Sequence, residues 1–210
     1  MTPVYSVPVT PEPHVRELEI KRSQFITFVG QASDRAAAEA FIRSIRELHP
    51  QARHVCWAYI AGAPDTTVMS MSDDGEPGGT AGRPMLKVLQ HSGLGEIVVA
   101  VVRYFGGIKL GTGGLQRAYS DAVILGLAEL PTEQRIPQTR LTLEYDYPME
   151  AVVRHLLDQY PTTIEHCDFQ ARVCMKLLVA DSDRENFILA LTNQSGGAIR
   201  VVSSIQQDCS

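Results

Sequence analysis

The sequence has little cysteine, no long apolar run and no excess of positive charge. No CxxC pair occurs, which excludes a zinc knuckle and a thioredoxin-type redox centre; the cysteines are Cys56, Cys167, Cys174 and Cys209. No apolar run is long enough to cross a bilayer, and the N-terminal residues lack the basic-then-apolar order of a signal peptide. We therefore expect a cytoplasmic protein with no membrane partner.

The formal net charge of −5 argues against broad attraction to nucleic acid, because that attraction depends on phosphates neutralised by Lys and Arg. The charge is unevenly distributed. Residues 1–136 carry 13 basic and 14 acidic residues, whereas residues 137–210 carry 6 and 10. We expect that residues 137–210 do not bind nucleic acid unaided, while a local basic patch in the first part would permit it.

A polar segment divides the chain. LPTEQRIP, residues 130–137, has proline near each end and follows a long apolar stretch, as is typical of a linker. We predict an α+β protein of two domains, 1–136 and 137–210. In the first we expect strands at about residues 17–30, 54–61, 66–72 and 96–105, and helices from an N-cap at Ser33 to His49, at 83–93, and from Gly114 to Leu130.

The second domain shows a regular alternation of strand and helix patterns. The strands are predicted at 139–147, 162–169, 172–179 and 198–205. One helix begins at Pro148, and the other is capped by Asp181 or Ser182 and ends at Gly196 or Gly197. The order βαββαβ is that of the ferredoxin-like arrangement.

Two glycine-rich segments, residues 75–84 and 103–119, each stand between a strand and a helix. Free backbone N–H groups and the helix dipole attract anions at that position, although neither segment has a P-loop or dinucleotide-binding pattern. We predict that the segments are neighbours and bind an anionic ligand; in the alternative, the glycines only permit tight turns. The expected ligand-binding residues are Arg83, Arg103, Gly106, Gly107, Lys109, Gly111, Gly113, Gly114 and Arg117.

Three carboxylates, Asp73, Asp74 and Glu76, come just before or within the first segment. Hard oxygen ligands of this kind suit magnesium or calcium, although the EF-hand spacing is absent. Asp also stabilises turns by bonding to nearby backbone, and the carboxylates could instead pair with the arginines. Magnesium is the only cofactor that the pattern would support, and we expect no other.

Nucleophilic catalysis is the weaker interpretation of His54 and Cys56. On a strand their side chains face the same way, as a thiolate and imidazole pair would require. The apolar stretch HVCWAYIA favours a buried structural thiol at Cys56 instead. The other histidines show no ligand spacing. We therefore expect no catalytic residue and favour a protein without enzymatic activity.

Two ordered blocks, SDDGEPGGTAGRP and IVVAVVRYFGGIKLGTGGL, resemble the signature of the IMPACT/YigZ family (UPF0029), with IKRSQFI and ARHVCWAYI matching upstream. The resemblance covers about residues 15–130. It implies an N-terminal fold like domain 2 of ribosomal protein S5 and a C-terminal domain similar to one of translation elongation factor G. Eukaryotic members of the family regulate translation, and the resemblance carries no catalytic assignment.

Three hypotheses of function remain open. The first is a non-enzymatic regulatory protein linked to translation, which docks RNA or a ribosome-associated protein on the glycine-rich surface. The second is an enzyme or sensor for a small phosphorylated ligand, with Asp73 or Asp74 holding magnesium. The third is a scaffold whose glycine-rich loops are purely architectural.

Overall fold

The computed structural model describes residues 4–9 and 11–203. It divides into two compact units, and the boundary falls between Arg135 and Ile136. Both units combine helices with antiparallel sheets, so the chain is a two-domain α+β protein. Within the described residues, no helix is long and apolar enough to span a membrane.

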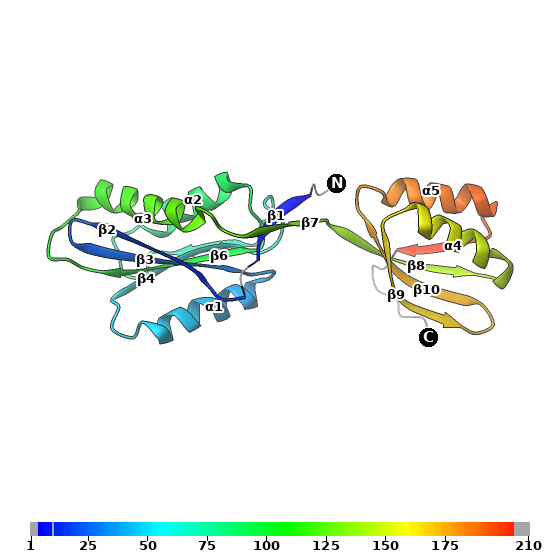
Figure 1. Cartoon of the computed structure of the whole chain (residues 1–210), viewed down its shortest axis with the longest axis horizontal. Coiled ribbons are helices and arrows are strands. Elements are labelled where there is room, and N and C mark those ends of the chain that lie inside the picture. Colours follow the sequence, from blue (N-terminus) through cyan, green and yellow to red (C-terminus); the bar gives the residue numbers. More distant parts are fainter. Residues whose placement is uncertain (1–3, 10, 204–210) are drawn as a thin grey trace. The chain divides into compact units, whose positions relative to one another are not determined.

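The first unit is built on a five-stranded antiparallel sheet with strand order β2-β3-β6-β4-β5 (Figure 1). A separate antiparallel pair is formed by β1 and β7. The elements in chain order are β1 (Tyr5–Pro8), β2 (His14–Ile20), β3 (Ser23–Gln31), α1 (Arg35–Leu48), β4 (His54–Ile60), β5 (Met69–Ser72), α2 (Gly82–Ser92), β6 (Ile97–Tyr104), α3 (Gly111–Leu127) and β7 (Thr132–Arg135).

Helices cover both faces of this sheet: α2 and α3 lie on one face and α1 lies on the other (Figure 1). The central strand β6 serves both faces. Val99 and Val101 pack in the core under α2 and α3, whereas Val98 and Val102 pack in the smaller clusters on the α1 side. This explains the almost wholly apolar sequence of β6, because a strand buried on both faces has no solvent side.

Three local features of the first unit differ from the sequence prediction. Asp34, not Ser33, caps α1, since its side chain accepts a hydrogen bond from the Ala37 N–H at 2.8 Å. The first predicted strand is a hairpin, β2 and β3. The predicted linker contains β7, whose polar residues gave no strand signal because β7 is held by backbone pairing with β1.

The second unit has the element order βαββαβ, as predicted, and the sheet order β11-β8-β10-β9. Helix α5 begins after Asp183 rather than Asp181 or Ser182, and Gly196 ends it in the left-handed conformation. The predicted last strand is described only as far as Ser203. The elements are β8 (Gln138–Tyr145), the 3-10 helix η1 (Tyr147–Met149), α4 (Glu150–Gln159), β9 (Thr162–Phe169), β10 (Val173–Ala180), α5 (Arg184–Ser195) and β11 (Arg200–Ser203).

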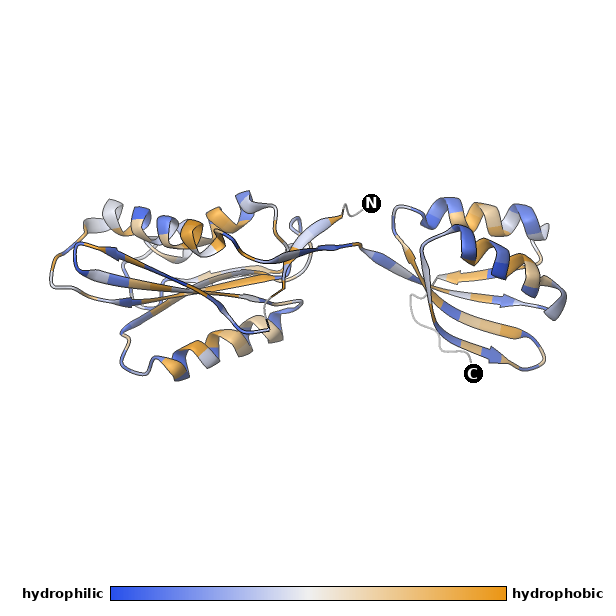
Figure 2. Cartoon of the chain, viewed as in Figure 1, coloured by the Kyte–Doolittle hydropathy of each residue, from blue (hydrophilic) through white to orange (hydrophobic). Residues whose placement is uncertain are grey.

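The core of the second unit lies between its sheet and the helices α4 and α5. Alternate residues of β10 are buried, and Phe187 and Leu191 of α5 pack on them. Figure 2 shows apolar and polar stretches alternating along α4 and α5, as expected of helices with one face on a core. Each unit therefore has a hydrophobic core of its own.

Candidate functional site

The first glycine-rich segment encloses a carboxylate of the protein itself. One Asp73 oxygen accepts hydrogen bonds from the backbone N–H groups of Ala81 and Gly82 at 2.9 and 2.8 Å, and the other accepts one from Gly79 at 2.8 Å. Burial raises the pKa of Asp73, but these three bonds outweigh it, so its pKa lies below the usual value. The N-terminus of α2 is thus already neutralised by Asp73.

Close packing explains why glycine stands at the start of α2. A Cβ atom on Gly82 would lie 2.9 Å from the backbone nitrogen and carbonyl carbon of Ser72. The turn before it is tight as well, because Asp74 and Gly75 both have positive φ, 44° and 84°. At this segment the interpretation of the glycines as architecture agrees with the geometry.

The two other motif carboxylates also have partners within the protein. Asp74 accepts a hydrogen bond from the Val55 N–H and pairs with Arg46, both at 2.7 Å. Glu76 is buried and pairs with Arg103 at 2.6 Å. Of the roles considered for these acids, pairing with an arginine is the one that the geometry of Asp74 and Glu76 displays.

Behind Glu76 lies a buried polar cluster. The Tyr119 hydroxyl donates a hydrogen bond to Glu76 at 2.9 Å, and the Cys56 Sγ lies 3.3 Å from that hydroxyl oxygen. Burial raises the pKa of Cys56 to about 12 and raises that of Tyr119 as well. Cys56 is fully buried, as the sequence predicts for its thiol.

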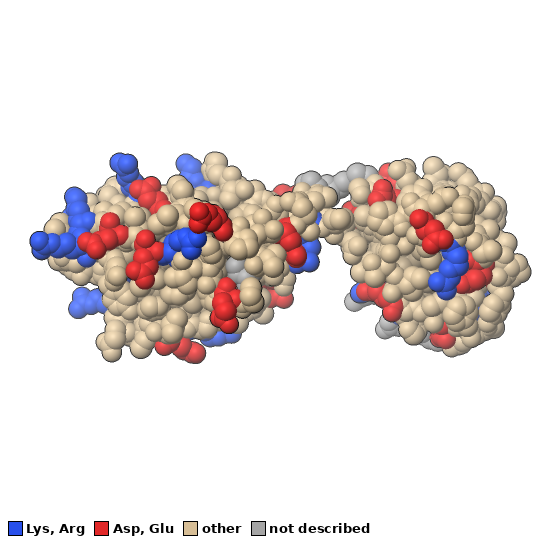
Figure 3. Space-filling view, viewed as in Figure 1, with Lys and Arg blue, Asp and Glu red and all other residues tan. Residues whose placement is uncertain are grey.

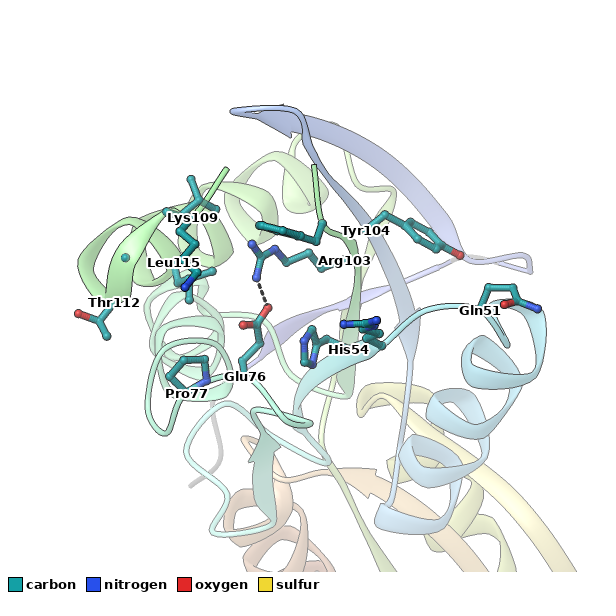
Figure 4. A pocket seen from close by; sticks show the side chains of 13 residues that line it. Gln51, His54, Glu76, Pro77, Arg103, Tyr104, Lys109, Thr112 and Leu115 are labelled. Atoms are coloured by element: carbon teal, nitrogen blue, oxygen red, sulfur yellow. Dashed lines mark hydrogen bonds and ion pairs between the residues drawn. The ribbon is translucent and has the colours of Figure 1, made fainter. Parts of the chain in front are cut away.

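A cavity of about 630 Å³ opens on the other side of the Glu76–Arg103 pair (Figure 4). The start of α3 forms one wall and the end of β6 forms another. The residues before and within β4 and the loop between β5 and α2 form the rest. In Figure 4, Arg103 and Glu76 face each other at its centre. The lining residues are Gln51, Arg53, His54, Glu76, Pro77, Arg103, Tyr104, Phe105, Lys109, Leu110, Gly111, Thr112 and Leu115. We call this space the β6–α3 cavity.

The N-terminus of α3 has no internal carboxylate of the kind that Asp73 provides for α2. Its N-cap residue Leu110 cannot accept a hydrogen bond through its side chain, and no acidic residue lies in the first turn. Gly111, where α3 begins, has a φ of 75° and lines the cavity with Lys109 and Thr112. The helix end therefore presents unpaired N–H groups and a partial positive charge beside a basic side chain.

Arg103 is buried at 7% exposure but only partly satisfied. One guanidinium nitrogen pairs with Glu76, whereas its Nε has no hydrogen-bond partner among the described residues. The guanidinium lies 5.5 Å from the ring centre of Phe25 and 5.6 Å from that of Phe105. Since Phe105 is 57% exposed, it offers an aromatic face to solvent at the mouth of the cavity.

The two glycine-rich segments are neighbours, as predicted. The Gln116 side chain in α3 donates a hydrogen bond to the Gly79 carbonyl at 3.3 Å. The predicted residues nevertheless fall into two groups. Arg103, Lys109 and Gly111 line the β6–α3 cavity, whereas the others lie outside it.

A second, shallower hollow of about 520 Å³ holds part of the remaining group. It is lined by Arg83, Gly113 and Arg117, among others. Arg117 pairs with Asp121 on the exposed side of α3 at 3.6 Å. A Cβ atom added at Gly114 would lie 3.2 Å from the Leu110 Cβ, and Gly106 and Gly107 lie in the loop before α3. Ligand binding by Arg83 and Arg117 stays a prediction.

Sequence reasoning did not select several residues that line the cavity, above all Arg53, His54 and Phe105. The His54 Nδ1 lies 2.9 Å from the Asp74 carbonyl oxygen. Because a carbonyl only accepts, Nδ1 carries the proton in this contact. The exposed Phe105 could have been noticed as an aromatic residue followed by two glycines, a position where a strand ends.

Metal binding has no preformed cluster to support it in the described part of the chain. No group of three or more His, Cys, Asp or Glu side chains there could hold a metal ion. Asp73 and Asp74 use their oxygens on backbone and arginine donors instead.

Comparisons with known proteins find matches to the same family along most of the chain. The Impact N-terminal domain family matches residues 21–127, and a domain of unknown function, DUF1949, matches residues 143–198. IMPACT family member YigZ of Escherichia coli is 43% identical over 88% of this chain and 91% of its own. IMPACT family member YvyE of Bacillus subtilis is 34% identical over 86% and 83%.

A solved structure described as that of a hypothetical protein is 40% identical, with a TM-score of 0.71 over 97% of this chain and 98% of its own. The family match covers more than half of the chain, and the relatives are matched over most of their length. The chain belongs to the IMPACT family.

Proposed function

We propose that this protein is a non-enzymatic regulator associated with translation, and that it binds single-stranded RNA at the β6–α3 cavity. The observation that carries the proposal is the convergence of three features on one cavity: the uncapped start of α3, the basic side chains of Arg53 and Lys109, and the exposed ring of Phe105. Membership of the IMPACT family supports the association with translation.

A phosphate is the group that the start of α3 would attract. Free N–H groups of the first turn and the partial positive charge of the helix end both favour an anion, and Lys109 stands next to them. Among the residues that the structure describes, Glu76 is the only acidic one that lines the cavity, and it is already paired with Arg103. Little negative charge in the cavity therefore opposes the ligand.

An aromatic side chain at the mouth of the cavity favours a nucleic acid over inorganic phosphate. A base that stacks on an exposed ring gains about 1–3 kcal/mol, and any base can do so. Phe105 is suited to this because the Arg103 guanidinium lies near its ring while more than half of the residue remains exposed. Only an unpaired strand can turn a base onto such a ring, so single-stranded RNA is expected.

The volume of the cavity supports a second candidate, a small phosphorylated ligand such as a mononucleotide. About 630 Å³ lies within the range of cavities that hold small molecules. Such a ligand would use the same helix end and the same Lys109. The two candidates differ in length dependence, because only an RNA strand gains affinity beyond one nucleotide.

The test compares binding of a fluorescent single-stranded RNA of about eight nucleotides, its duplex, and AMP over a salt series. We expect tightest binding of the single strand. Lys109→Ala should make the negative slope of log K against log salt shallower by about 0.7, the value for one lost phosphate contact. Arg117→Ala tests the other predicted group: a strand that contacts only the cavity should leave its slope unchanged, because Arg117 lies outside the cavity, whereas a shallower slope would support the sequence prediction for Arg117.

Other outcomes decide between the hypotheses. Binding of AMP as tight as that of the RNA would favour the small ligand. Equal loss of salt dependence in Lys109→Ala and Arg117→Ala would place the ligand over the start of α3 rather than in the cavity. If the parent protein binds none of the probes, the proposal is wrong and the glycine-rich loops are architecture.

A further inference from the structure

The turn between β2 and β3 is strained and carries two cations. Ile20 pairs with Ser23, which leaves Lys21 and Arg22 as a two-residue hairpin turn. Their φ angles are 48° and 66°. Turns of this type require positive φ at both central residues and are therefore usually Asn-Gly or Asp-Gly. Lys and Arg at these two positions therefore make the turn less stable than Asn-Gly or Asp-Gly would.

This turn is pressed against the loop that borders the β6–α3 cavity. A Cβ atom on Gly106 would lie 2.0 Å from the carbonyl carbon and oxygen of Arg22, so only glycine fits there. The Gly106 N–H also donates a hydrogen bond to the Ser23 hydroxyl at 3.2 Å. Phe105 directly precedes that glycine and Lys109 follows three residues later, and both line the cavity.

Both cations of the turn are available to a ligand. Lys21 and Arg22 are exposed, and neither side chain has a hydrogen bond or ion pair with any residue that the structure describes. In Figure 3, Lys and Arg side chains gather at the end of this unit where the β2–β3 turn and the loop before α3 meet. Two exposed cations thus lie on the turn that packs against the loop bordering the cavity.

We propose that Lys21 and Arg22 form a second phosphate-contact site for the RNA strand whose first phosphate lies at the start of α3. The inference rests on the proposed function. Residues in sparsely populated conformations persist where the surrounding structure over-determines them, and they cluster at functional sites. Gly106 and Ser23 over-determine this turn, and a strained conformation presents two unpaired cations beside a cavity that already suits a nucleotide.

The test separates charge from strain. Lys21→Asn/Arg22→Gly removes both charges and supplies the preferred turn residues, so we expect the Tm to rise by about 2–4 °C. Affinity for the RNA of about eight nucleotides should fall by about 25-fold at ~0.1 M salt, since each phosphate contact contributes about fivefold there. Lys21→Gln/Arg22→Gln should lose the same affinity without the rise in Tm.

Arg35→Gln/Arg43→Gln is the matched control. It removes two charges from exposed positions on α1, which covers the opposite face of the sheet from α3. We expect it to change affinity by less than about twofold. AMP should bind to both turn variants as it binds to the parent protein, because one nucleotide fills only the cavity.

The inference is overturned if the turn variants bind RNA like the parent while Lys109→Ala still weakens binding. It is also overturned if the α1 control loses as much affinity as the turn variants, because net charge would then be the cause. A parent protein that binds neither RNA nor AMP overturns the proposed function itself, and this inference falls with it.

Discussion

Replacement of Asp73 by alanine should convert an internal cap into an empty anion site. The Asp73 carboxylate accepts three backbone hydrogen bonds from the segment that leads into α2. Alanine removes the acceptor and leaves those N–H groups facing a space of carboxylate size. We expect a destabilised protein that gains the ability to bind small anions.

The magnitude follows from the number of bonds. Each is a bond to a charged group, which contributes about 1.5–3 kcal/mol when buried; because Asp73 is only partly buried, we discount this to about 1–1.5 kcal/mol each. Loss of all three should lower the free energy of unfolding by about 3–4 kcal/mol, which corresponds to a fall in Tm of roughly 10 °C for a chain of this size. A domain of ordinary stability survives such a loss.

The assay is urea unfolding and thermal melting of Asp73→Ala with formate or with chloride at the same ionic strength. Formate can occupy the position of the missing carboxylate, so it should raise the Tm of the variant and leave that of the parent protein unchanged. Two results would contradict the reasoning: a variant as stable as the parent, or equal effects of formate and chloride.

Asp73→Asn supplies a control through pH. The pKa of Asp73 is lowered on folding, with burial opposing the shift and the backbone bonds producing it. The carboxylate therefore stabilises the fold fully above the unfolded pKa of about 3.9, and this contribution is lost as pH falls through the lower folded value. The difference in unfolding free energy between parent and Asp73→Asn should shrink as pH falls below about 4.

Three further predictions concern the same unit. Glu76→Ala should lower the free energy of unfolding by about 3–5 kcal/mol in urea titrations, because it leaves Arg103 buried without its partner; an unaffected midpoint would show that the pair is dispensable. Gly106→Ala should prevent folding or lower the Tm sharply, whereas Gly113→Ala, which has no atom within 4 Å of the added Cβ, should raise stability by up to about 1 kcal/mol. Since the pKa of Cys56 is raised to about 12, iodoacetamide at pH 8 should leave Cys56 unmodified in the folded protein, as mass spectrometry of its peptides would report.

Much of the fold could be predicted because its signals are local. The apolar run of β6 and the βαββαβ order of the second unit depend on periodicity along the chain. The β2–β3 hairpin was missed because Lys21 and Arg22 carry no turn signal, and the contact that holds them, Gly106, is more than 80 residues away. Strand β7 was missed because its pairing with β1 depends on the backbone alone.

The candidate site could be predicted only as far as the two segments being neighbours. That Asp73 would occupy the first segment depends on the path of the loop, which folds back so that residues 79 to 82 surround one carboxylate. The pairing of Arg103 with Glu76 likewise depends on the register of β6 between β3 and β4. No spacing rule in the sequence distinguishes a cation available to a ligand from one neutralised by a distant acid.

The same internal pairing weakens the objection that the net charge of −5 raises against an RNA ligand. The three acids of the motif face the protein: Asp73 bonds to backbone, Asp74 to Arg46, and Glu76 to Arg103. Four of the five surplus negative charges lie beyond residue 136, in the other unit. Since charges are screened over about 10 Å at ordinary salt, a ligand at the start of α3 responds mainly to nearby Lys109 and to the helix end, not to the total.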